Sequence, residues 1–182
     1  LKARPGFEFW LGTDVLGRDI FSRVIHGARI SLTVGFFAPV FGMIIGLFFG
    51  MLAGYYRGAL ESTIVSITDI ILAFPNIVLA MCILFFAGAT MINLIIVLSI
   101  TSIPANTRIA RASTLVFAGR EFVMAARSQG ASNLRILWHE ILPNIVLPQL
   151  AYILSFMSIV IMIEGSLAFL GVGIPPPTPT LG

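Results

Sequence analysis

Few residues of this chain have the chemistry of a catalytic site, and their spacing fits no common one. A nucleotide-binding P-loop needs a lysine after its glycines to reach the phosphates, but Lys2 is the only lysine and no such loop surrounds it. His139 and Glu140 resemble the start of a zinc-protease helix, yet Pro143 stands where the second histidine ligand would be. We therefore expect neither a nucleotide site nor a metal site in this chain.

Covalent chemistry has no better support. An intramembrane serine protease would need a base beside its serine, and neither His26 nor His139 lies within an apolar run. Cys82 is the only cysteine, so the chain can build neither an internal disulfide nor a cysteine metal site. We expect a protein that is not an enzyme.

Two acidic residues remain as functional candidates because they lie inside long apolar runs. Burying a charge in hydrocarbon costs about 3 kcal/mol or more, so Asp69 and Glu164 need a reason to be there. Each could line a pathway for a solute, or each could pair with another helix. The sequence leaves both interpretations open.

The composition indicates that these residues sit in a membrane protein. Hydrophobic residues make up 58% of the 182 residues and charged residues 10%, which leaves too few polar side chains to cover a soluble globule. The net charge is +3, but the basic residues gather in a few connecting stretches. This clustering is typical of loops between membrane spans and argues against nucleic-acid binding.

Four apolar runs are long enough to cross a bilayer, since about 20 helical residues span roughly 30 Å. The second run contains Pro75 and the third ends near Pro104. Proline in a packed bundle more often kinks a helix than ends it, so the third helix can continue through Arg108 and Arg111. The expected spans are residues 30–56, 63–87, 91–107 and 144–170.

The first span carries glycines at four-residue intervals, at Gly42, Gly46, Gly50 and Gly54. In a helix this spacing places all four on one face, where the missing side chains permit close backbone approach. We expect a helix-packing face that lies inside the protein or against a partner rather than toward lipid.

Residues 108–143 form the longest internal polar stretch. Within it the spacing of Leu134, Leu137, Trp138 and Ile141 predicts an amphipathic helix with Ser132 as its N-cap and Pro143 as its stop. A second short helix precedes Gly130, whose missing side chain allows the turn between the two. We expect two short helices outside the membrane, within residues 122–141.

Sidedness does not follow from charge alone. The side that holds residues 1–29 has five Lys and Arg residues, and the side that holds Arg57 and residues 108–143 has six. The excess of basic residues that marks cytoplasmic loops is therefore absent.

The segment EFVMAARSQGASNLRILWHEILP, from Glu121 to Pro143, resembles the signature loop of importer-type ABC permeases. It has two alanines, a glycine four residues after the second, and a later Leu-Pro. Met124 departs from the family's usual glutamate and Glu140 from its isoleucine. Three further stretches resemble the dipeptide and oligopeptide subgroup: LGTDVLGRDIFSRVIHGARISL from Leu11, DIILAFPNIVLA from Asp69 and FLGVGIPPPTPTLG from Phe169.

This resemblance implies an all-α polytopic bundle, in which residues 1–29 are extracytoplasmic, residues 30–182 form the permease domain and residues 108–143 form a cytoplasmic coupling loop. Family members carry six spans, so the chain would lack the first and the last. The resemblance implies that the loop docks on an ATPase subunit through Glu121, Phe122, Ala125, Ala126, Arg127, Gly130, Ala131, Ser132, Leu142 and Pro143.

The implied partners are a second permease, two ATPase subunits that bind ATP and magnesium, and an extracytoplasmic substrate-binding protein. The implied substrate is a di- or oligopeptide, and the implied location is the cytoplasmic membrane of a bacterium or archaeon. The alternative is a self-contained secondary carrier or channel in which Asp69 and Glu164 coordinate ions or protons.

Overall fold

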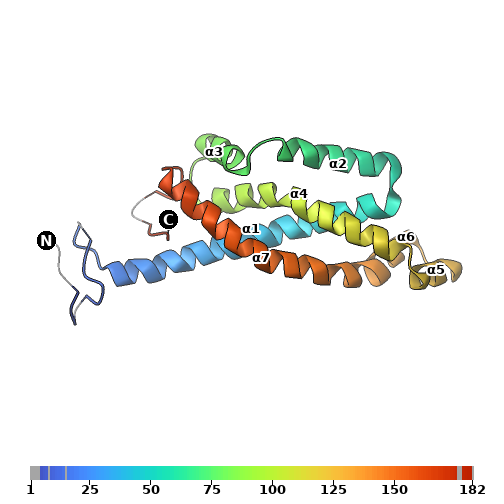
Figure 1. Cartoon of the computed structure of the whole chain (residues 1–182), viewed down its shortest axis with the longest axis horizontal. Coiled ribbons are helices and arrows are strands. Elements are labelled where there is room, and N and C mark those ends of the chain that lie inside the picture. Colours follow the sequence, from blue (N-terminus) through green and yellow to red (C-terminus); the bar gives the residue numbers. More distant parts are fainter. Residues whose placement is uncertain (1–4, 8, 15, 176–177, 182) are drawn as a thin grey trace.

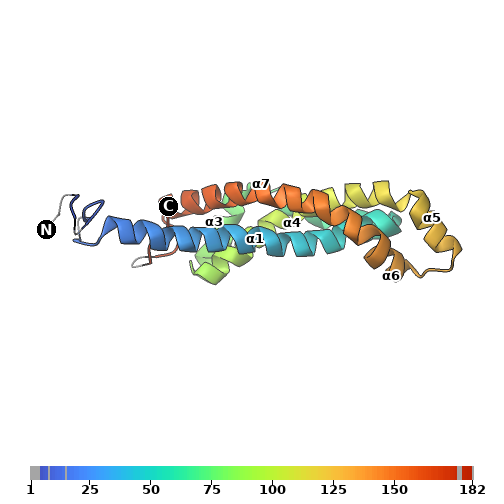
Figure 2. The same cartoon turned by 90° about the horizontal axis from the view of Figure 1, so that it is seen from below.

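The computed structural model describes residues 5–7, 9–14, 16–175 and 178–181, and this part of the chain is helical without a β-strand. The helices form an elongated bundle (Figures 1 and 2). The described residues before helix α1 lie at one end and the short helices α5 and α6 at the other. Lys2, the only lysine of the sequence, lies outside the described residues.

Helix α1 runs from Ile20 to Tyr56 and begins ten residues before the expected span. The side chain of Asp19 caps it by accepting hydrogen bonds from the backbone N–H groups of Phe21 and Ser22, both at 3.2 Å. The 37 residues reach about 55 Å, well beyond the hydrocarbon thickness, so Arg23 and Arg29 can be helical without entering the hydrocarbon.

The second expected span is not one helix. Helix α2 covers Gly58–Leu72 and α3 covers Asn76–Ala87, and the two meet at 82°. Pro75 lies between them, lacks an N–H and disfavours helical backbone at Phe74, which explains the break. With 12 residues, about 18 Å, α3 is too short to cross a bilayer alone.

Helix α4, Met91–Ala118, continues without interruption through Pro104 and past the expected end of the third span at residue 107. Arg108 and Arg111 therefore belong to a helix of the bundle rather than to a loop.

The expected stop at Pro143 is wrong. Helix α5 covers Glu121–Ser128 and α6 Asn133–Arg135, but a π-helical stretch, η1 Ile136–Ile141, leads directly into α7, Leu142–Phe169. Pro143 lies in the first turn of α7. A proline inside an α-helix lacks the N–H of one backbone hydrogen bond, and its ring clashes with the carbonyl four residues earlier. The wider π turns before Pro143 accommodate both the missing hydrogen bond and the ring.

Helices α1 and α4 run in the same direction and pack at very close range. Each glycine of the α1 row faces a position 60 residues later on α4: Ser102, Asn106, Ala110 and Thr114. A Cβ added at Gly50 would lie 2.4 Å from the Thr107 carbonyl oxygen and 2.5 Å from the Ala110 Cβ. The glycine row is thus a packing face inside this chain, and a row of small buried side chains on α4 completes it.

Candidate functional site

The end of α5 is shaped by a turn at Gly130, whose φ is +80°. The N–H of Gly130 donates to the Arg127 carbonyl (3.0 Å) and that of Ala131 to the Ala126 carbonyl (3.1 Å). This pair of bonds is the Schellman motif, which satisfies the last carbonyls of a helix and requires a left-handed residue, usually glycine. Backbone hydrogen bonds therefore connect Ala126 and Arg127 of the loop signature to the turn at Gly130.

The next helix starts where expected. The Ser132 hydroxyl accepts a hydrogen bond from the Arg135 N–H at 3.3 Å and caps α6. Beneath the turn, Val123 is fully buried in a cluster with Met51 of α1 and Ile136, Leu137, Ile141 and Ile145. This cluster fixes both short helices to the end of the bundle.

The ten residues that the resemblance singles out do not share one surface. Glu121, Phe122, Ala125, Gly130 and Ser132 are exposed in the segment that holds α5 and the start of α6. Ala126 and Ala131 are partly buried and pack on the Val123 cluster, as does Leu142, while Pro143 is exposed at the start of α7. Of the two signature alanines, Ala125 is thus at the surface and Ala126 faces the Val123 cluster.

Arg127 is engaged within the chain. Its Nη2 donates to the Tyr55 hydroxyl at 3.2 Å, and that hydroxyl donates to the Asn133 Oδ1 at 2.8 Å. Neither Tyr55 nor Asn133 could be recognised from the sequence, because a tyrosine at the end of an apolar span carries no signal beyond that of an interfacial aromatic residue.

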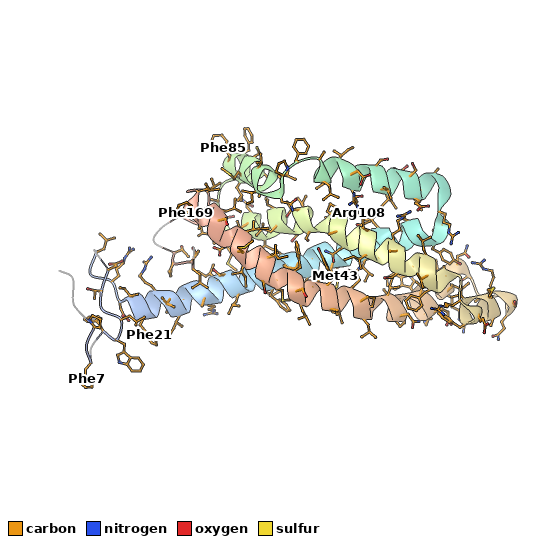
Figure 3. The ribbon with its side chains drawn as sticks, in the orientation of Figure 1. Phe7, Phe21, Met43, Phe85, Arg108 and Phe169 are labelled. Carbon is orange, nitrogen blue, oxygen red and sulfur yellow. The ribbon has the colours of Figure 1, made fainter. Side chains whose placement is uncertain are left out.

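Asp69 pairs with another helix. Its Oδ1 accepts a hydrogen bond from Arg108 Nη2 of α4 at 2.7 Å, and both side chains are about half exposed. Arg108 lies on α4 below α2 in Figure 3. A second ion pair joins Arg111 of α4 to Glu61 of α2. Two ion pairs between an acidic residue and an arginine therefore connect α2 to α4.

Glu164 is buried and also joins helices. Its Oε2 accepts a hydrogen bond from the Ser31 hydroxyl of α1 at 2.9 Å, while its Oε1 has no hydrogen-bond partner among the residues that the structure describes. The Ser31 oxygen in turn accepts the Leu181 N–H at 3.3 Å. Glu164 thus links α7 to α1 and, through Ser31, to the last described residues.

A second buried polar contact joins two helices in the interior. Gln149 of α7 donates from Nε2 to the backbone carbonyl of Asn106 at 2.9 Å, and both residues are fully buried. The signal for them was present in the sequence, since each is an amide inside an expected apolar helix.

At the opposite end of the bundle, a compact turn precedes α1. Hydrogen bonds from the N–H of Arg18, from its side chain and from the N–H of Leu16 lower the pKa of Asp14 to about 2. Within the part of the chain that the structure describes, no three His, Cys, Asp or Glu side chains come together as metal ligands.

The family of the binding-protein-dependent transport system inner membrane component matches residues 46–182. Over all 182 residues the chain is 42% identical to the glutathione transport system permease protein GsiD of Pectobacterium atrosepticum, covering 60% of that protein. Over 98% of its length it is 41% identical to the dipeptide transport system permease protein DppC of Alkalihalophilus pseudofirmus, covering 59% of it. The chain thus spans about three fifths of the length of these relatives.

The fold has solved counterparts. An inward-facing structure of the MetNI methionine ABC transporter superposes with a TM-score of 0.75 at 20% identity, covering 85% of this chain and 77% of the other. An amino acid ABC transporter gives a TM-score of 0.60 at 18% identity over 89% and 79% of the two chains. At this identity the likeness extends to the fold alone.

Proposed function

The chain belongs to the family of binding-protein-dependent transport system inner membrane components, and from this we propose that it is the membrane-spanning permease part of an ATP-driven importer for short peptides. The observation that carries the proposal is the match of the whole chain, at more than 40% identity, to permeases named for dipeptide and glutathione transport. Glutathione is itself a small peptide, so both names point to one class of substrate.

The ATPase subunit docks, in this proposal, on the exposed side of α5. By helical position Phe122, Ala125 and Gln129 share one face, and all three are exposed. The inner side of α5 is anchored through Val123, which keeps the helix at a defined angle. A rigid helix that is anchored on one side and bare on the other can carry a displacement from a partner into the bundle.

The other components of the proposed importer are separate subunits. A second permease completes the pathway, two ATPase subunits bind ATP and magnesium, and an external binding protein delivers the peptide. The location proposed is the bacterial cytoplasmic membrane. The family match favours this scheme over a self-contained carrier, and the ion pair of Asp69 with Arg108 gives that carboxylate a role between helices.

Reconstitution of the full-length protein in liposomes tests the proposal. With the partner permease, the ATPase subunits and the binding protein present, we expect uptake of labelled di- or tripeptide that requires ATP, and none when the ATPase subunits are omitted. Peptide uptake by the single subunit, driven by a proton gradient and abolished by Asp69→Asn, would contradict it and establish the carrier.

A further inference from the structure

Tyr55, the next-to-last residue of α1, contacts both short helices of the loop at once. Its hydroxyl donates to Asn133 Oδ1 of α6 at 2.8 Å and accepts from Arg127 Nη2 of α5 at 3.2 Å. The guanidinium carbon of Arg127 also lies 5.9 Å from the centre of the Tyr55 ring, within the range of a cation–π contact. One phenol thus holds the end of one helix and the start of the next.

These contacts orient Arg127 without a countercharge. No carboxylate of the described residues lies within ion-pairing distance of its guanidinium. The apolar contacts of Val123 and Met51 also join α5 to α1, but apolar packing is weakly directional. The two hydrogen bonds of a rigid phenol therefore supply the directional link between the loop and α1.

The link leads straight to the glycine row. Gly54 directly precedes Tyr55, and a Cβ placed on it would lie 2.8 Å from both the Arg111 carbonyl oxygen and the Thr114 Cβ of α4. Backbones in such close contact cannot move independently. A displacement of α5 that reaches Tyr55 is consequently passed to α1 and α4 together.

We propose that Tyr55 is a positioning residue that sets the angle of the loop against α1 and passes the loop's displacement to the α1–α4 pair. This inference rests on the proposed function, since it assigns the route by which an ATPase partner would move the spans. Tyr55 itself touches neither ATP nor peptide in this scheme.

The chain supplies matched variants. Tyr55→Phe keeps the ring and removes only the hydroxyl, and Tyr56→Phe is its control, since the Tyr56 hydroxyl has no hydrogen-bond partner among the residues that the structure describes. Asn133→Ala removes the oxygen that accepts the Tyr55 hydrogen bond.

The test compares peptide uptake with ATP hydrolysis in liposomes that hold the complete complex. We expect Tyr55→Phe and Asn133→Ala to lower the peptide transported per ATP by roughly threefold to tenfold, as the loss of one hydrogen bond from a moving element implies. Tyr56→Phe should keep the wild-type ratio. An unchanged ratio in Tyr55→Phe, or uptake and hydrolysis that fall in parallel with the amount of complex, overturns the proposal.

A second measurement separates this proposal from the proposed function. In the full-length permease without partners, Tyr55→Phe should speed amide hydrogen exchange across residues 121–133 relative to Tyr56→Phe. If exchange is unchanged, the positioning role is wrong even where the complex transports peptide. If Tyr55→Phe speeds the exchange but the wild-type complex shows no ATP-dependent uptake, the proposed function is wrong. The role of Tyr55 in passing on a displacement is then wrong as well.

Discussion

At the scale of single residues, Gly130 is set apart by its backbone. Its φ of +80° lies in the left-handed region, and a Cβ added there would meet no atom within 4 Å. A substitution at Gly130 is therefore unfavourable because of local backbone strain and not because of a steric clash with neighbouring atoms. This distinction separates Gly130 from the glycines of α1 and allows a sharp test.

We expect Gly130→Val to uncouple the complex and Gly130→Asn to be tolerated. Left-handed backbone costs an L-residue about 1–2 kcal/mol, more for a β-branched side chain and less for asparagine, which adopts it readily. The measurement is ATP-dependent peptide uptake by assembled complexes that carry each variant. Normal uptake by the valine variant would show that the turn does not matter for coupling.

At the scale of elements, two helix pairs are held by different means. The α1–α4 pair is joined by a continuous row of glycine contacts, with Ser102, Asn106, Ala110 and Thr114 opposite. The α2–α4 pair borders, with α1, a partly open apolar pocket of about 190 Å³ and is joined by two acid–arginine pairs. The stability of the α1–α4 pair should fall when a glycine is replaced by a larger residue, and that of the α2–α4 pair when one charge is removed.

For the first pair we expect Gly50→Ala to lower the stability of the assembled protein by about 1–3 kcal/mol, and Gly50→Leu by more. The added atoms meet the backbone of α4, which cannot move aside without separating the helices. Gly119→Ala is the control, because its φ is −92° and its nearest neighbour would be 3.9 Å away. Thermal unfolding in detergent measures the effect, and equal melting of the Gly50 and Gly119 variants would contradict it.

For the second pair we expect Asp69→Asn or Arg108→Gln alone to cost about 1 kcal/mol or more, because each leaves a charge without its partner near the membrane. The double variant should recover much of this loss and should transport peptide. Melting temperatures measure the loss and recovery of stability, and peptide uptake measures transport. A double variant that folds but cannot transport would show that Asp69 does more than clip α2 to α4.

At the scale of the whole molecule, the bundle has two distinct polar ends. The Asp14 turn and the start of α1 lie at one end, and α5 and α6 at the other (Figure 2). Between them, Phe85 and Phe169 lie on the outside of the bundle, where lipid or another subunit can cover them (Figure 3). Basic residues occur at both ends, as the near tie in the charge count implies.

We expect the two ends to face opposite sides of the membrane, with α5 in the cytoplasm. In a full-length protein made free of other cysteines and produced without the ATPase subunits, Leu16→Cys should react with a membrane-impermeant maleimide in intact cells, and Gln129→Cys only in inverted vesicles. Both original side chains are exposed, so neither cysteine should be shielded by the fold. Labelling of both from one side would contradict the arrangement.

The sequence by itself determined the features that depend on local chemistry. Composition required a bilayer, four glycines at helical spacing required a close neighbour, and Gly130 and Ser132 predicted a turn and a cap through their own backbone and side-chain preferences. The composition is a property of the whole chain, and the glycine row, the turn and the cap each follow from residues close together in the sequence.

The tertiary structure decided what the prolines do and which residues meet. Pro75 ends a helix, whereas α4 continues through Pro104 and Pro143 starts a helix that the sequence predicted it would stop. All three prolines lack the same N–H, so the difference comes from the packing around each one. The partners of Asp69, Glu164 and Tyr55 likewise lie at least 39 residues away in the chain, where no local pattern can indicate them.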